Sequence, residues 1–247
     1  MPVTQERVMT VESGAWCPTS FPRWKRILDC TIVLLTLPVW LLLTVVVMVW
    51  IKMVSDGPVF YRQERVGYRG RPFMLFKFRT MHVNAETQTH EQHLARLIDE
   101  NCPMQKLDVS GDSRVIRGGW MIRGAGLDEL PQVFNVLLGE MTLVGPRPCL
   151  PNEFERYRVD QRQRVNVPPG LTGYWQVNGK NEVTFSDMIE MDRFYATNLS
   201  LWLDLKIILK TFPVLIKEAR KARRNSRQVS VPFSIPNFRV GARSDQQ

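Results

Sequence analysis

One long apolar run constrains the fold of this chain more than any other feature. Cys30 to Ile51 holds 22 residues without a formal charge, and fourteen of them are Leu, Ile or Val. Insertion of these aliphatic side chains into a bilayer is favoured by on the order of 4 to 8 kcal/mol, which outweighs Pro38 and three threonines. The run is too long, and starts too far into the chain, for a cleavable signal peptide. It is therefore predicted to lie in a membrane.

Pro38 and the flanking charges bear on whether the run crosses that membrane. A helix of 22 residues can just span the hydrocarbon core. Proline, however, removes a helical hydrogen bond and clashes with the preceding turn, and basic residues at both ends keep both ends cytosolic. We therefore expect a helix-break-helix that enters and leaves one leaflet, with a single kinked span and an outside N-terminus as the alternative. The flanking residues are Arg23, Lys25 and Arg26 before the run and Lys52, Arg62 and Arg65 after it.

The overall charge points to a polyanionic neighbour. The 247 residues carry a formal net charge of +9, which suits nucleic acid, an anionic lipid surface or phosphorylated substrates. Nucleic acid is disfavoured because the basic residues cluster around apolar segments rather than on one soluble face. The four cysteines form no CxxC pair, so neither a zinc site nor a disulfide framework is indicated. A reducing, cytosolic setting follows.

Two adjacent carboxylates, Asp128 and Glu129, lie in an apolar frame at a predicted helix start. Pro131 suits the first turn of that helix, where no backbone donor is needed, and Asp128 falls near its N-cap. At a cap both carboxylates can face one ligand, such as an anion or a metal-bound phosphate. Farther along, Arg147 stands between two prolines, which suits bidentate contact with phosphate. Taken singly, these features fit a capped helix and a surface turn better than a ligand site. Together with the apolar run, they favour a ligand site.

A β-hairpin is predicted between the apolar run and the carboxylates. Residues 59–66 and 73–78 have the pattern of strands, and 68–71 that of a turn. Lys77 and Arg79, at the end of the second strand, are predicted to lie nearest the substrate. A lipid-headgroup contact or a solvated basic face is the alternative.

Several other segments have weaker patterns. Arg123 is placed to reach the same phosphate as the carboxylates, with a salt bridge to Glu129 as the structural alternative. Residues 84–102 are predicted to form a polar surface helix, 108–114 a turn, and 153–165 a charged, solvated helix without a chemical role.

The C-terminal third combines a turn-rich loop with a second apolar segment. Residues 168–180 are dense in turn formers around an aromatic pair, which predicts a loop of fixed shape. Residues 199–216 suit a helix in the membrane interface, broken at Pro213, or equally a buried core helix. Basic residues at 217–227 favour the membrane surface. The last twenty residues have the composition of a disordered tail.

Together these features predict an α+β fold, mostly helical with a β-hairpin, a proline-broken re-entrant membrane helix and amphipathic interfacial helices. Four parts are expected. They are an N-terminal tail at 1–22, the re-entrant membrane helix at 23–54, a cytosolic catalytic domain with the interfacial helices at 55–217, and a basic, disordered tail at 218–247.

Seven motifs in one order make the chain resemble the bacterial sugar transferases, the monotopic polyprenyl-phosphate phosphoglycosyl transferases, over about residues 23–217. They are Lys25-Arg26 with Asp29 ahead of the proline-broken run, GPVFYRQERVG, KFRTM, LDELPQ, GEMTLVGPRP, PGLTGYWQVNG and LWLDLKIILKT. No single motif would suffice, so the resemblance depends on the order and spacing of all seven. It is to the small, catalytic-domain form of the family.

The resemblance implies transfer of a phosphosugar from a UDP-sugar to undecaprenyl phosphate, with release of UMP. This would be the first membrane step of exopolysaccharide, O-antigen or glycoprotein glycan synthesis, at the cytosolic face of the bacterial inner membrane. The nucleophile of the family corresponds to Asp128, which would form an acyl-phosphate intermediate. Glu129 would help to deprotonate the lipid phosphate. Mg²⁺ is the implied cofactor, held by Asp128 or Glu129 together with substrate phosphate.

The resemblance also implies residues that bind substrate. Arg147 in GPRP and Arg123 match phosphate-binding arginines, and Asp192 matches an acidic position that the family places near its site. A non-catalytic membrane-surface adaptor of a glycan-assembly complex is the alternative function, and no motif names the sugar. The predicted binding residues are Lys77, Arg79, Arg123, Arg147, Pro148 and Asp192.

Overall fold

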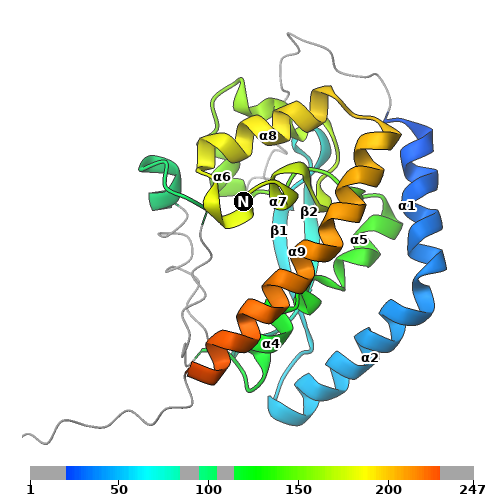
Figure 1. Ribbon diagram of the computed structural model, residues 1–247, viewed down its shortest axis with the longest axis vertical. Coiled ribbons are helices and arrows are strands. Elements are labelled where there is room, and N and C mark those ends of the chain that lie inside the picture. The colour runs from blue at the N-terminus through cyan, green and yellow to red at the C-terminus, as the bar shows by residue number, and fades with distance from the viewer. Residues whose placement is uncertain (1–20, 84–94, 105–113, 229–247) are drawn as a thin grey trace, which may run out of the picture.

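A computed structural model describes residues 21–83, 95–104 and 114–228 of the chain (Figure 1). Nearly all of the predicted turn at 108–114, most of the predicted surface helix at 84–102 and the outer parts of both predicted tails lie outside these residues. The described residues confirm a mostly helical fold with one antiparallel β-hairpin.

The elements differ widely in length. The long helices are α1 (Arg23–Leu35), α2 (Leu37–Val54), α8 (Phe185–Thr197) and α9 (Leu201–Gln228). The short helices are α4 (Gly119–Gly124), α5 (Gln132–Leu138), α6 (Pro151–Glu155) and α7 (Tyr174–Val177). The strands are β1 (Phe60–Val66), β2 (Pro72–Phe78), β3 (Thr142–Val144) and β4 (Gly170–Thr172). Four 3-10 turns are η1 (Tyr68–Gly70), η2 (Leu127–Glu129), η3 (Gln161–Asn166) and η4 (Lys180–Glu182).

The apolar run forms two helices that meet at Thr36. The Thr36 hydroxyl donates a hydrogen bond back to the Ile32 carbonyl at 2.7 Å, and α2 starts at the next residue. Pro38 lies in the first turn of α2, where its missing N–H removes no helical hydrogen bond. Figure 1 shows α1 and α2 running in different directions from this junction.

Buried polar contacts hold the start of α1 against the rest of the molecule. The Lys25 ammonium lies 2.5 Å from a carboxylate oxygen of Asp204 in α9, and both side chains are fully buried. Asp29 accepts a hydrogen bond from the Thr142 hydroxyl in β3 at 2.6 Å. Arg26 donates to carbonyl groups at the end of α5. One face of α1 thus binds three other elements.

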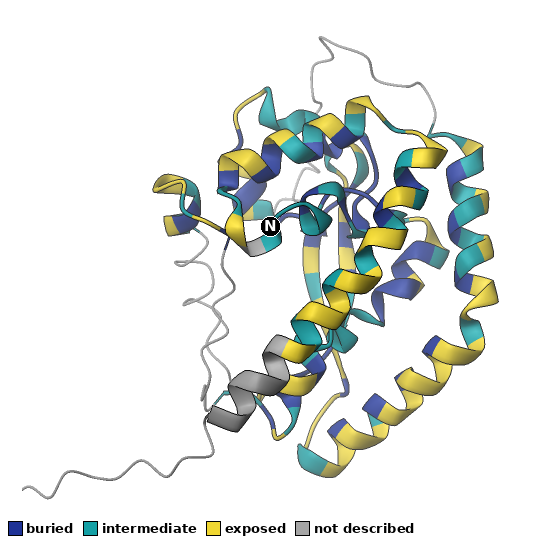
Figure 2. Cartoon of the chain, viewed as in Figure 1, coloured by how far each residue is buried: buried dark blue, intermediate teal, exposed yellow. Residues whose placement is uncertain are grey.

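The end of α2 packs on the same body. The Trp50 indole N–H donates to the Arg117 carbonyl at 3.1 Å, and Ile51 is fully buried. Between these ends most of α2 is exposed (Figure 2). With a mean hydropathy of 2.3, α2 is the one helix in the described part of the chain that is long and apolar enough to cross a membrane.

The hairpin matches the predicted strands to within about a residue. Phe60 pairs with Phe78 at one end and Val66 with Pro72 at the other. Asn135 of α5 covers the free edge of β2, where its amide accepts from the Phe76 N–H at 3.1 Å and donates to the Met74 carbonyl at 2.8 Å. The buried amide replaces a neighbouring strand at this edge.

The turn-rich segment at 168–180 is more regular than predicted, because it contains β4 and the single turn of α7. Strands β4 and β3 are parallel and approach very closely. A Cβ placed on Gly170 would lie 2.1 Å from the backbone nitrogen of Gly145. Only glycine fits at that contact, which brings the loop after β3 against the loop before β4.

Two predictions for the charged segments were wrong. Residues 153–165 form α6 and η3 instead of one solvated helix, and Glu153 and Arg164 are both 1% exposed. Their charges are buried because they pair with each other and with Asp192. Helix α9 is not broken at Pro213 but continues to Gln228, into the predicted tail. Pro213 is exposed, so the lost hydrogen bond lies where water can replace it.

Candidate active site

The two adjacent carboxylates lie on a tight turn that precedes α5. Gly126 adopts a left-handed conformation with φ of 71°, and the chain then forms the 3-10 turn η2, which contains Asp128 and Glu129. Helix α5 starts only at Gln132, with Pro131 as its N-cap. The N-cap predicted near Asp128 is therefore about three residues too early. Both carboxylates are half-buried, which leaves them accessible to a ligand.

A lysine from the hairpin lies beside this turn. The Lys77 ammonium is 3.5 Å from a carboxylate oxygen of Glu129, and the two side chains are 25% and 37% exposed. Lys77 follows Phe76, whose N–H is held by Asn135. Asn135 therefore ties the helix after the carboxylates to the strand that carries the lysine. Sequence reasoning missed Asn135, although a polar residue inside an apolar helix is a usable signal.

Helices α4 and α9 complete the surroundings of the turn. Arg123 lies in the last turn of α4, three residues before Gly126. The Leu215 side chain in α9 comes within 3.6 Å of the position that a Cβ on Gly126 would occupy. The structure thus places Lys77, Arg123 and both carboxylates on adjoining elements. We call Asp128, Glu129 and Lys77 the carboxylate turn.

Arg79 is found elsewhere, at the junction of α2 and β1. It is 7% exposed and donates to the Ser55 carbonyl at 3.3 Å. Its Nε and Nη1 atoms have no hydrogen-bond partner among the described residues. The predicted contact of Arg79 with substrate stays a prediction.

Of the remaining predicted residues, Arg147 and Asp192 belong to a buried group of charges that we call the arginine cluster, and the Pro148 carbonyl accepts a hydrogen bond from Arg65 in it. Arg164 bridges its members, with Nη2 2.5 Å from an Asp192 carboxylate oxygen and Nη1 2.5 Å from the Tyr157 hydroxyl. The Tyr157 hydroxyl donates to Glu153 at 2.5 Å. The members are Arg65, Arg147, Glu153, Tyr157, Arg164 and Asp192. Figure 1 shows α8, which carries Asp192, at one end of the hairpin and α4 at the other.

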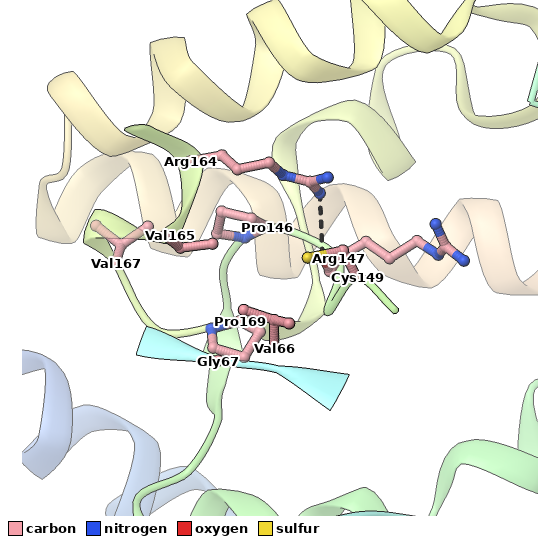
Figure 3. Close-up of a pocket in the computed structure, with 9 residues that line it drawn as sticks. All are labelled: Val66, Gly67, Pro146, Arg147, Cys149, Arg164, Val165, Val167 and Pro169. Carbon is pink, nitrogen blue, oxygen red and sulfur yellow. Dashed lines mark hydrogen bonds between the residues drawn. The ribbon is translucent and has the colours of Figure 1, made fainter. Parts of the chain in front are cut away.

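Arg147 reaches out of this cluster. Its Nη1 lies 3.5 Å from a carboxylate oxygen of Glu153, and its side chain is 27% exposed while that of Glu153 is fully buried. A small cavity, with room for about one water molecule, is lined by Val66, Pro146, Arg147 and Pro169, among other residues. The Arg147 side chain extends away from that cavity (Figure 3).

Burial and charge act in opposite directions on the acids of the cluster. Burial favours a higher pKa for Glu153, but the attraction of Arg147 and Arg164 outweighs it and lowers that pKa. For Asp192, burial prevails over the attraction of Arg164 and raises the pKa to about 6. Burial and the nearby Arg147 lower the pKa of Arg65 to about 10. Of these three groups, Asp192 has the pKa nearest to neutral pH.

The donor set at the carboxylate turn suits a magnesium ion shared with a substrate. No group of three or more His, Cys, Asp or Glu that could hold a metal occurs among residues 21–83, 95–104 and 114–228. Mg²⁺, however, is commonly held by one or two carboxylates together with water and substrate phosphates. Asp128 and Glu129, adjacent and half-exposed, fit that pattern.

Comparison with known proteins shows one family. The family model of the bacterial sugar transferases matches residues 21–218. Galactosyl transferase CpsE of Streptococcus agalactiae is 36% identical over 193 residues, which are 78% of this chain and 42% of that protein. The undecaprenyl-phosphate galactose phosphotransferase of Salmonella typhimurium is 38% identical over 175 residues, 68% of this chain and 36% of that protein.

The coverage differs between relatives. The exopolysaccharide production protein ExoY of Sinorhizobium fredii is 37% identical over 193 residues, which are 77% of this chain and 84% of that protein. By contrast, the chain spans less than half the length of the CpsE and Salmonella proteins.

Proposed function

Because the chain belongs to the bacterial sugar transferase family, we propose that it transfers a phosphosugar from a UDP-sugar to undecaprenyl phosphate. The products are undecaprenyl-diphosphate-sugar and UMP. The observation that carries this proposal is the carboxylate turn, with its two accessible carboxylates and Lys77. Leu127 and Leu130, on either side of the carboxylates, pack against a cluster that includes Ile51 of the exposed apolar helix α2, which with α1 forms a helix pair. A related protein is named for galactose phosphate transfer to this same lipid.

Asp128 is the nucleophile in this proposal. A carboxylate oxygen attacks the sugar-bearing phosphorus, the bond from that phosphorus to the bridging oxygen breaks, and UMP leaves with that oxygen. An oxygen of the lipid phosphate then attacks the same phosphorus and releases the Asp128 carboxylate. Each step exchanges one phosphorus–oxygen bond for another, so no oxidant or further reactant is needed.

The neighbouring residues have distinct tasks. Glu129 accepts the proton of the lipid phosphate and is held beside the Lys77 ammonium. Lys77, Arg123 and Arg147 supply positive charge for the diphosphate of the donor. Bound Mg²⁺, held by Asp128 or Glu129 and the substrate, would neutralise phosphate charge at this turn.

The anchoring of the helix pair supports a re-entrant membrane segment. The Lys25–Asp204 pair at the start of α1 and the Trp50–Arg117 contact at the end of α2 bind the same compact body. Both ends therefore lie on one side of any membrane that the middle of the pair enters. A single span would place the start of α1 on the far side, away from Asp204.

Exposed apolar side chains on other elements support a monotopic protein at the cytosolic face of the inner membrane. Helices α4 and α9 carry large apolar residues that are at least 40% exposed, and α9 continues into a basic segment. Such a helix suits the interface of anionic lipid and water. The residues include Trp120, Met121, Trp202, Leu209, Phe212 and Ile216.

Release of UMP tests the proposal. Purified protein in nanodiscs with undecaprenyl phosphate and Mg²⁺ is expected to release UMP from one member of a panel of UDP-sugars. Omission of the lipid should limit release to about one UMP per protein molecule, as expected for a covalent intermediate. A protein that releases no UMP from any UDP-sugar would instead act as a membrane-surface adaptor.

A further inference from the structure

The loop that carries Arg147 is held at the main-chain carbonyl groups of residues 146–149. Four consecutive carbonyl groups each accept a hydrogen bond from a different residue. Pro146 accepts from the Gly170 N–H at 2.8 Å, Arg147 from Arg164 Nη2 at 2.9 Å, Pro148 from Arg65 Nη1 at 3.1 Å, and Cys149 from the Val66 N–H at 2.9 Å.

Two of these four donors are side chains of buried arginines. Arg65 is 8% exposed and Arg164 is 1% exposed, so neither side chain can move freely in solvent. Burial of a guanidinium is costly unless its donors are satisfied. Each arginine is also held from its other side, Arg65 by the Gln63 side chain at 2.7 Å and Arg164 by Asp192. Each arginine therefore connects the loop to a second side chain.

The same cluster also orients the Arg147 guanidinium. Glu153 lies 3.5 Å from its Nη1, and Glu153 is itself fixed by the Tyr157 hydroxyl at 2.5 Å and the Leu150 N–H at 3.2 Å. The main chain and the side chain of Arg147 therefore have separate restraints that meet in one network.

The charges of the cluster do not balance. Three guanidinium groups, of Arg65, Arg147 and Arg164, face the two carboxylates of Glu153 and Asp192. One positive charge is left in excess, and Arg147, with a side chain that is 27% exposed, is the most exposed of the three arginines. Its side chain points away from the other labelled residues in Figure 3. An anion at Arg147 would compensate this excess, because like charges in a buried site repel each other.

We infer that Arg65 and Arg164 are positioning residues that present Arg147 to a phosphate of the sugar nucleotide. They grip the carbonyl groups of Arg147 and Pro148 and have no contact with substrate themselves. This inference rests on the proposed function, in which Arg147 binds the donor diphosphate. It adds two residues outside the predicted site, together with a reason why the proline-flanked arginine holds one orientation.

A double-mutant cycle tests the inference. Arg65→Lys and Arg164→Lys each keep the charge, but lysine lacks the planar fork that reaches two acceptors at once. Each is expected to raise the KM for the UDP-sugar about tenfold, the effect of one lost charged hydrogen bond, and to leave kcat within about threefold. In an Arg147→Ala background, neither substitution should raise the KM further, because they act through Arg147.

Controls separate this outcome from general damage. Arg158→Lys changes an exposed arginine in the same stretch and should leave the KM unaltered in both backgrounds. Urea unfolding identifies a lysine variant that fails to fold, in which case Glu153→Gln replaces it in the cycle. Equal effects of Arg65→Lys or Arg164→Lys with and without Arg147 would overturn the inference. A wild-type protein that releases no UMP would overturn the proposed function as well.

Discussion

The carboxylate turn and the arginine cluster use the same residue types in opposite ways. At the turn, Asp128 and Glu129 are half-exposed, and the contact of Glu129 with Lys77 is a loose 3.5 Å. In the cluster, Arg164 and Asp192 are about 1% exposed and lie 2.5 Å apart. Exposed pairs exchange partners readily, whereas buried pairs are held by the cost of separating them.

In the proposed function, this difference separates the residues that react from the residues that position others. A nucleophile must be reachable by substrate and must change partners during the reaction, which an accessible turn allows. A residue that orients another must keep one partner, which burial enforces. We therefore expect changes at the turn to lower turnover with little loss of stability. Changes in the cluster should lower stability, or raise the KM, before they affect the chemical step.

Asp128→Asn should have the largest effect on activity. The amide is a poor nucleophile, so steady-state UMP release is expected to fall by at least about a thousandfold. The midpoint of urea unfolding should stay close to that of the wild type. Asp160→Asn, at an aspartate paired on the surface with Arg158, is the matched control and should retain activity. Near-normal UMP release by Asp128→Asn would show that Asp128 is not the nucleophile.

Arg164→Met should have the largest effect on stability. It leaves Asp192 and Glu153 buried beside one fewer counter-charge, which is expected to cost about 3–5 kcal/mol in the free energy of unfolding. Urea titration in detergent, followed by tryptophan fluorescence, measures this cost. Arg158→Met serves as the exposed control, with an expected change of less than about 1 kcal/mol. Equal losses in the two variants would show that the cluster contributes no special stability.

Asp192→Asn should change how stability depends on pH. Burial raises the pKa of the Asp192 carboxyl group from 3.8 to about 6 in the folded protein. The folded state therefore binds this proton more tightly than the unfolded state. The resulting stabilisation is fully present below about pH 3.8 and is lost as the pH rises through 6. The wild type should thus lose about 1 kcal/mol relative to the variant between pH 5 and pH 7. Parallel urea titrations at both pH values measure this difference. If the difference in stability between wild type and variant does not change with pH, Asp192 does not titrate between pH 5 and pH 7.

Lys77→Gln should have the smallest effect on stability. The pair with Glu129 is partly exposed, so its loss is expected to change the free energy of unfolding by less than about 1 kcal/mol. Turnover should nevertheless fall, because positive charge is removed beside the reacting phosphate. Thermal unfolding and UMP release on the same preparation compare the two effects. A loss of stability as large as that of Arg164→Met would assign the turn a structural role.

Local patterns predicted the parts of this chain that depend on near neighbours. The sequence showed three of these parts directly: the uncharged run from Cys30 to Ile51, the two strands of the hairpin and the Asp128–Glu129 pair. Hydrophobic periodicity and turn residues report on the preferences of a few consecutive residues. For that reason the types of segment were predicted better than their ends, as the late start of α5 shows.

Buried charge was not predictable in the same way. Residues 153–165 have the composition of a solvated helix, yet Glu153 and Arg164 are buried. The apolar Phe154, Tyr157 and Val165 within that stretch are a signal of burial, because they form part of a core cluster. The continuation of α9 through Pro213 was also missed. Pro213 is exposed, and the Leu215 side chain just beyond it contacts the distant Gly126, which no pattern in the helix itself shows.

The chain's own residues indicated a mostly helical protein with one long apolar segment, an acidic pair and a proline-flanked arginine. Which charges meet was settled by the fold, because partners come from distant positions: Lys25 and Asp204 are 179 residues apart, and Arg164 and Asp192 are 28 apart. A charged side chain can be buried without a large cost only where the fold places a counter-charge beside it. The position of the counter-charge depends on how helices and strands pack, which no local sequence pattern encodes.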